Sequence, residues 1–145
     1  MRIAVISDTH DKLPGHVLEA IQEAEEIWHL GDVVSPSILQ RVKALGKPLK
    51  IVRGNCDFCA EWPLVEDFEL EGFRIRLVHI PPSPPPAGVD LLFHGHTHVP
   101  RNEVLGSTRF FNPGCITRPN RGAPASYAWL ELKSGEVPKW EWRLV

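Results

Sequence analysis

The segment Arg2-Ile3-Ala4-Val5-Ile6-Ser7-Asp8-Thr9-His10 follows Met1 directly and decides the fold. Its apolar run predicts a strand that is buried on both faces of a parallel sheet. Asp8 and His10 come immediately after this run, where the predicted strand ends. Because they are two residues apart and leave the same strand, their carboxylate and imidazole groups can both reach one bound metal ion.

Two more predicted strands end in the same manner. Glu26–Leu30 runs into Gly31-Asp32, and Leu49–Val52 is followed by Gly54-Asn55. In open α/β sheets, ligand sites lie beyond the carboxyl ends of the strands. We therefore expect Asp8, Asp32 and Asn55 to meet at one rim of a sheet.

Helices are predicted between these three strands. The first starts near Pro14 and has apolar residues at helical spacing, namely Val17, Leu18, Ile21 and Ala24. The second has Ser35 as its N-cap, Pro36 as its first residue and Gly46 beyond its end. The first part of the chain is thus βαβαβ, which implies a parallel sheet with right-handed crossovers.

The rest of the chain is predicted to be rich in strands. These are Phe68–Leu70, Phe73–His79, Asp90–Phe93, Val99–Leu105, Arg109–Asn112, Tyr127–Leu132 and Val137–Leu144. Pro81–Pro86 is expected to form a stiff loop, with an exposed linker or a partner-binding segment as the competing view. No repeat or boundary interrupts the sequence, so a single domain over residues 1–145 is predicted.

Composition and charge exclude several classes of function. A formal net charge of -2 over 145 residues leaves no basic footprint for long nucleic acid. No apolar run approaches the roughly 20 residues that span a bilayer. A removable signal peptide would take Asp8 and His10 with it, so we expect a cytoplasmic protein. Among the three cysteines, Cys56 and Cys59 are interpreted as small half-buried thiols rather than a redox pair or half of a zinc site.

Seven polar residues at predicted strand ends have the chemistry of metal ligands. They are Asp8, His10, Asp32, Asn55, His79, His96 and His98. Carboxylate, imidazole and amide oxygen together suit two neighbouring divalent transition metal ions. Asp32 has two carboxylate oxygens and can bridge a pair of ions, whereas Asn55 adds a neutral oxygen that limits the negative charge.

These blocks, taken in order, resemble the calcineurin-like metallophosphoesterase superfamily. The residues that carry the resemblance are Asp8-Thr9-His10, Gly31-Asp32, Gly54-Asn55-Cys56-Asp57, His79 and Gly95-His96-Thr97-His98. The most similar branch is that of the small bacterial and archaeal YfcE-type phosphodiesterases. The resemblance implies an α/β fold with a β-sandwich flanked by helices, in αββα layers. It also implies that Asp8, His10 and His98 hold one metal ion, that Asn55, His79 and His96 hold a second, and that Asp32 bridges them.

The same resemblance implies a metal-dependent phosphodiesterase. A metal-bridging hydroxide would attack phosphorus in line, at a centre formed by Asp32, Asn55 and His96. Cys56 stands where many relatives have a histidine thought to protonate the leaving group, so we expect weaker activity on alkoxide than on phenolate leaving groups. Manganese is the ion expected first, with iron(II), zinc, nickel and cobalt as alternatives. The expected substrate is a small phosphodiester or a nucleotide-type molecule.

Two other functions stay open at this point. One is a binding or scaffold protein that kept the fold and lost turnover, and the other is a phosphomonoesterase on the same site. His29 and His94 are interpreted as structural histidines, with a donor to the site and a phosphate contact as the respective alternatives. Asp57 either orients a metal ligand or is a turn aspartate. Trp140 and Trp142 fit core packing or a contact between copies of the chain, so a homo-oligomer is also open.

Overall fold

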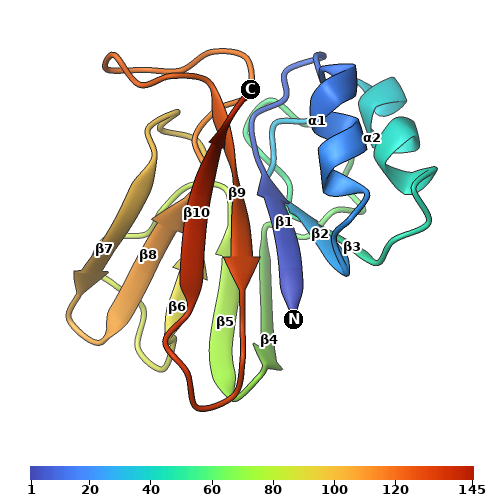
Figure 1. The fold of residues 1–145 in the computed structure, drawn as a ribbon. Coiled ribbons are helices and arrows are strands. Elements are labelled where there is room, and N and C mark those ends of the chain that lie inside the picture. Colours follow the sequence, from blue (N-terminus) through green and yellow to red (C-terminus); the bar gives the residue numbers. More distant parts are fainter.

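The computed structural model describes residues 1–145 and contains two five-stranded sheets stacked face to face (Figure 1). The first sheet has the order β10-β9-β1-β2-β3. Its strands are β1 (Arg2–Ile6), β2 (Glu26–His29), β3 (Leu49–Ile51), β9 (Ser126–Glu131) and β10 (Lys139–Leu144). β1, β2 and β3 run parallel, as the βαβαβ order predicted, and β9 and β10 add antiparallel neighbours.

The second sheet has the order β4-β5-β6-β8-β7. Its strands are β4 (Val65–Leu70), β5 (Phe73–Val78), β6 (Leu91–Phe93), β7 (Arg101–Leu105) and β8 (Thr108–Asn112). β5, β6 and β8 are parallel in the middle of the sheet, and the two edge strands are antiparallel. The predicted strand-rich second half is therefore confirmed, and β4 and β5 pair as an antiparallel hairpin.

Both helices, α1 (Gly15–Ile21) and α2 (Pro36–Lys43), pack on the outer face of the first sheet (Figure 1). Strand β1 shows why the layers separate in this way. Ala4 and Ile6 face the helices, whereas Ile3 and Val5 face the second sheet, because side chains alternate along a strand. The predicted βαβαβ unit and the β-sandwich are thus confirmed. The predicted αββα layering is not, because both helices cover the first sheet and the chain has no helix left for the outer face of the second, so the layers are αββ.

Aromatic residues fill the space between the two sheets. Trp28 from β2 meets Phe93 from β6 with ring centroids 5.1 Å apart, and Phe93 stacks on Phe111 at 4.8 Å. Trp140 covers Phe111 at 4.8 Å and belongs to the same core. Its interpretation as a packing residue is therefore confirmed, and burial of these large rings is a major source of stability.

Two other features follow the sequence closely. The segment Pro81–Pro86 lies outside helix and strand, as predicted for a proline-rich loop. The two short helices lack the length and apolar character that a membrane crossing requires.

Candidate metal centre

Five loops meet at the rim formed by the carboxyl ends of the parallel strands. The loops after β1, β2 and β3 come from the first sheet, and the loops after β5 and β6 come from the second. The imidazole Nδ1–H of His79 donates to the carbonyl oxygen of Leu30 at 2.7 Å, which joins the two sheets. The backbone N–H of His96 donates to Oδ2 of Asp8 at 3.2 Å across the same rim. The loops after β1, β2 and β3 thus lie at one rim, as their order predicted, and the structure adds the loops of the second sheet to it.

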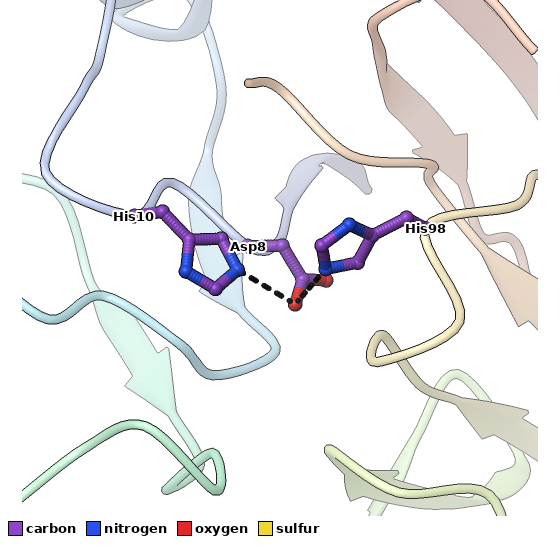
Figure 2. A group of neighbouring side chains, drawn as sticks. All are labelled: Asp8, His10 and His98. Atoms are coloured by element: carbon purple, nitrogen blue, oxygen red, sulfur yellow. Dashed lines mark ion pairs between the residues drawn. The ribbon is translucent and has the colours of Figure 1, made fainter. Parts of the chain in front are cut away.

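Asp8, His10 and His98 form the first group of candidate ligands (Figure 2). Nε2 of His98 lies 3.2 Å from Oδ1 of Asp8, and Nε2 of His10 lies 3.6 Å from the same oxygen. The two rings approach the carboxylate from opposite sides, with centroids 5.3 Å apart. One cation at this point would be within reach of all three side chains.

Asp32 and His79 extend this group into a second one that shares Asp8. Nε2 of His79 lies 3.3 Å from Oδ2 of Asp32 and 3.8 Å from Oδ1 of Asp8. Nε2 of His10 lies 3.6 Å from the same Oδ2 of Asp32. Asp32 therefore faces histidines of both sets that the family resemblance implied, which is the position a bridging ligand needs.

Asn55 and His96 lie beside each other at the solvent-exposed side of the centre. Nδ1 of His96 is 3.1 Å from Oδ1 of Asn55. The ring of His96 also meets that of His79 edge to face, with centroids 5.3 Å apart. All seven predicted residues are thus brought to one rim, with Asn55 and His96 at its outer side.

Buried polar atoms without partners mark the middle of this site. Oδ1 of Asp8, Nε2 of His10 and Nε2 of His79 are buried and make no hydrogen bond. The fourth such side-chain atom, Nε1 of Trp140, lies in the core between the sheets. An unsatisfied buried polar group costs about 1–3 kcal/mol, and a coordinated cation removes that cost. Oxygen and imidazole nitrogen are the donors that borderline divalent metals accept, so the residues fit such ions.

Backbone carbonyls set the orientation of two histidines. Because a carbonyl oxygen only accepts, Nδ1 of His79 carries the proton that it donates to Leu30. In the same way, Nδ1 of His98 donates to the carbonyl oxygen of Arg118 at 2.6 Å. In the neutral rings, Nε2 then has its lone pair directed toward the carboxylates, as is usual for metal-binding histidines.

The carboxylates and histidines perturb each other. Burial alone would raise the pKa of Asp8, but the rings of His10 and His98 bring it below its ordinary value. Burial opposes a charged His79, yet Asp32 and Asp8 raise the pKa of its ring. Asp8 likewise raises the pKa of His98. The site thus favours positive charge at its centre. When no metal ion is bound, protons on the histidines supply part of that charge.

The backbone at five candidate ligands has an unusual conformation. Asp8, His10, Asp32, His96 and His98 have φ values of 55°, 41°, 57°, 71° and 59°. For residues other than glycine, this left-handed region costs roughly 1–2 kcal/mol, and such strain gathers at functional sites. The sequence contained no signal for it, because the residue type alone does not report φ.

Two supporting residues have clearer roles in the structure than in the sequence. The carboxylate of Asp57 accepts backbone N–H groups from Asp32, Val34 and Gly54 at 2.8–2.9 Å, so it orients a ligand loop as well as its own turn. His29 is buried and takes the N–H of Gly31 on Nδ1, so its Nε2–H donates to Thr9. Both residues connect the loops that contain the ligands, and His29 is a structural histidine.

Cys56 lies next to this centre. Its backbone N–H donates to Oδ1 of Asp32 at 2.8 Å, and its thiol is grouped with His10 and Asp32. Burial and the Asp32 carboxylate raise the pKa of the thiol. Cys56 and Cys59 are free thiols, so the C-x-x-C does not form a disulfide.

A β-sandwich with a rim of converging carboxylates and histidines defines a candidate metal-dependent α/β protein, and the comparisons with known proteins name its family. The sequence profile described as "Calcineurin-like phosphoesterase superfamily domain" matches residues 1–135. The chain belongs to this superfamily, as the motif order predicted. Membership supports a hydrolase that acts on phosphoric esters with the help of divalent metal ions.

Curated relatives agree with this placement. A "probable metallophosphoesterase" of Methanothermobacter thermautotrophicus is 36% identical over 143 residues, covering 86% of this chain and 83% of the relative. The phosphodiesterase YfcE of Escherichia coli K12 is 31% identical over 161 residues, covering 90% and 88%.

Solved structures show the same fold. The structure of YfcE from E. coli has a TM-score of 0.79 at 32% identity and covers 90% of this chain and 88% of its own. Vps29 from Entamoeba histolytica, solved with Zn²⁺, has a TM-score of 0.80 at 21% identity and covers 99% and 98%. The second likeness concerns the fold alone.

Proposed function

We propose that this protein is a phosphodiesterase that works with two divalent transition metal ions. The observation that carries the proposal is the convergence of three buried, unpartnered atoms, from Asp8, His10 and His79, on one point of the rim. Within a phosphoesterase superfamily, such a point is best explained as a place for cations. Manganese is the first ion to test, followed by iron(II), zinc, nickel and cobalt.

The residues divide naturally between two ions. Asp8, His10 and His98 would hold the first ion, Asn55, His79 and His96 the second, and Asp32 would contact both. When bound, a pair of divalent ions lowers the pKa of coordinated water to about 7 and stabilises charge on the attacking and leaving oxygens of an in-line displacement.

The chain's own residues supply the geometry for this chemistry. Asp57 fixes the backbone of Asp32, and the carbonyls of Leu30 and Arg118 fix the rings of His79 and His98. Asn55 and His96 are exposed, whereas Asp8 and Asp32 are buried. The substrate phosphate therefore approaches from the side of Asn55 and His96.

Two observations favour a diester over a monoester substrate. The E. coli relative YfcE has the name phosphodiesterase, and it covers 90% of this chain. Cys56 stands beside Asp32 and does not supply the imidazole that many relatives have at this position. A diester with a phenolate leaving group needs little help from a protein acid and is the preferred test substrate.

The experiment measures hydrolysis of bis(p-nitrophenyl) phosphate with manganese. The wild type should turn over this ester, and Asp32→Asn should lose at least about a thousandfold in kcat/KM, because it removes charge between the two ions. Asp67→Asn is the matched control, since Asp67 is a carboxylate on β4 that pairs with Arg76 away from the rim. Its activity should match that of the wild type.

Metal analysis supplies the second readout. Purified wild type should contain about two transition metal ions per chain, and Asp32→Asn fewer. A protein that binds two ions but hydrolyses neither diesters nor monoesters would favour the scaffold function. A monoester hydrolysed much faster than the diester would favour the phosphomonoesterase, and Cys56→His should then change that ratio.

A further inference from the structure

A polar cavity of about 710 Å³ opens beside the candidate metal centre. His96 lies in its wall, so the cavity is continuous with the exposed side of the centre. Its charged lining residues are Arg101, Glu103 and Arg121, and Val99 is the single hydrophobic residue that lines it. This volume is within the range of pockets for small molecules, and charged and polar residues make up most of the lining.

Arg101 is held rigidly in this wall. Its guanidinium lies over the ring of Phe110, 4.4 Å from the centroid, and its Nε–H donates to the carboxylate of Glu103. One terminal nitrogen, Nη1, lies 3.1 Å from Nε2 of His94. The other terminal nitrogen has no acceptor in the protein, so Arg101 lines the cavity with donors still free.

His94 is suited to hold Arg101 in this position. It is fully buried, and its Nδ1 lies 2.9 Å from the carbonyl oxygen of Gly95. A carbonyl oxygen only accepts, so the Nδ1 proton is donated there and Nε2 accepts from Arg101. Both ring nitrogens of His94 are thereby engaged, and the contact with Nε2 fixes the position of the Arg101 guanidinium. His94 lies two positions before His96 in the sequence.

The charge of the cavity favours an anion. Glu103 is paired with Arg101, and the side chain of Arg121 makes no hydrogen bond or ion pair within the protein. Two guanidinium groups against one carboxylate leave a net charge of +1 in the lining. Arginine binds phosphate and carboxylate groups through paired N–H donors.

We propose that this cavity binds a second anionic group of the substrate, with Arg101 and Arg121 as its recognition residues and His94 as the positioning residue. This inference rests on the proposed phosphodiesterase function. It names the substrate class as a nucleotide-sized phosphodiester that has an additional phosphate group beside the ester that is cleaved.

Two esters that differ only in that phosphate test the proposal. They are the p-nitrophenyl ester of thymidine 5′-phosphate and the same ester with a 3′-phosphate. The wild type should prefer the 3′-phosphorylated ester by about tenfold or more in kcat/KM, because a charge-assisted contact is gained. Arg101→Gln should bring the ratio of the two kcat/KM values close to one, whereas Arg101→Lys should keep part of the preference. A merely structural role for Arg101 would change both substrates alike and leave the ratio as it is.

A control variant and a binding measurement complete the test. Arg143→Gln removes an exposed arginine on β10, paired with Glu141, and should leave the preference unchanged. Calorimetry should show that thymidine 3′,5′-bisphosphate binds the metal-loaded wild type about tenfold more tightly than thymidine 5′-phosphate, and that Arg101→Gln loses this difference.

The two sets of results separate the failures. If both esters are hydrolysed equally well and both nucleotides bind equally, the anion site is wrong while the phosphodiesterase function stands. If neither ester is hydrolysed but the bisphosphate still binds preferentially through Arg101, the phosphodiesterase function is wrong and the anion site stands.

Discussion

The carboxylate of Asp57 accepts the backbone N–H of Asp32 at 2.8 Å and so ties the loop after β2 to the loop after β3. The same carboxylate accepts the N–H groups of Val34 and Gly54 at 2.9 and 2.8 Å. One side chain thus fixes the backbone from which the candidate bridging ligand extends. Partners that orient metal ligands in this way typically contribute 10- to 100-fold, roughly, to metal affinity or activity.

Asp57→Ala should therefore weaken metal binding by about 10- to 100-fold and reduce the free energy of unfolding by about 2–3 kcal/mol, because three N–H groups lose their acceptor. Calorimetric metal titration and urea unfolding measure the two effects. Asp57→Asn keeps one acceptor oxygen and should lose less of both. Wild-type metal affinity in Asp57→Ala would show that Asp57 only forms a turn.

Gly54 is a position where even one methyl group should disrupt the site. A β-carbon there would collide with the backbone nitrogen and Oδ1 of Asp32. Gly54→Ala should displace Asp32 and reduce diester hydrolysis by at least about a hundredfold, since small misplacements at a reacting centre have effects of that size. Gly15→Ala is the matched control, because a β-carbon at Gly15 meets nothing within 4 Å. Equal activity of the two variants would contradict the close approach.

Backbone strain at the candidate ligands predicts that glycine variants there are more stable than alanine variants, the reverse of the order inside a helix. His98 has a φ of 59°, so in metal-free protein His98→Gly should be more stable than His98→Ala by about 1 kcal/mol. At Glu19, an exposed position inside α1, alanine should instead be more stable than glycine by about 1 kcal/mol. Chemical unfolding in the presence of a chelator measures both pairs. The same order at both positions would show that His98 is not strained.

His29 predicts a loss of stability in mild acid. Burial lowers its pKa from 6.5 to about 4. Above pH 6.5 the ring is neutral in both folded and unfolded protein; below it, only the unfolded state gains a proton, so stability falls until the folded pKa is reached. Each pKa unit corresponds to about 1.4 kcal/mol, so the total loss attributable to His29 is about 3 kcal/mol.

His29→Gln isolates this contribution, because glutamine can accept from Gly31 and donate to Thr9 without titrating. The unfolding free energies of metal-free wild type and His29→Gln are compared between pH 7.5 and 4, so that the other histidines cancel. The wild type should lose stability relative to the variant as the pH falls through this window. A constant difference would mean that His29 is not held neutral by burial.

Most of the fold was predictable because buried strands and their ends have strong local signatures. The runs 3–6 and Leu91–Phe93 are apolar throughout and lie in central strands. Helix ends were less predictable. The first helix ends at Ile21, although Ala24 continues the apolar spacing and is buried in the same cluster. Pro14 is its N-cap instead of its first residue, since a difference of one or two positions leaves the spacing pattern unchanged.

The residues of the candidate site were predictable from the sequence, but the hydrogen bonds that hold them in place were not. The seven candidate ligands stand out in the sequence because polar groups directly follow apolar strands. Asp57 lies 25 residues from the N–H of Asp32 that it accepts, and Asp8 lies 88 residues from the N–H of His96. No local pattern of residues encodes a contact across that distance.

What the amino-acid sequence determined by itself is which chemical groups stand at the ends of which strands, since alternation, apolar runs and turn residues are local properties. Only the tertiary structure decided how these groups face one another: the left-handed backbone at the ligands, the carbonyls that orient His79 and His98, and the His94–Arg101 pair beside the cavity. Those relationships depend on the packing of two sheets against each other, and packing is a property of the whole chain.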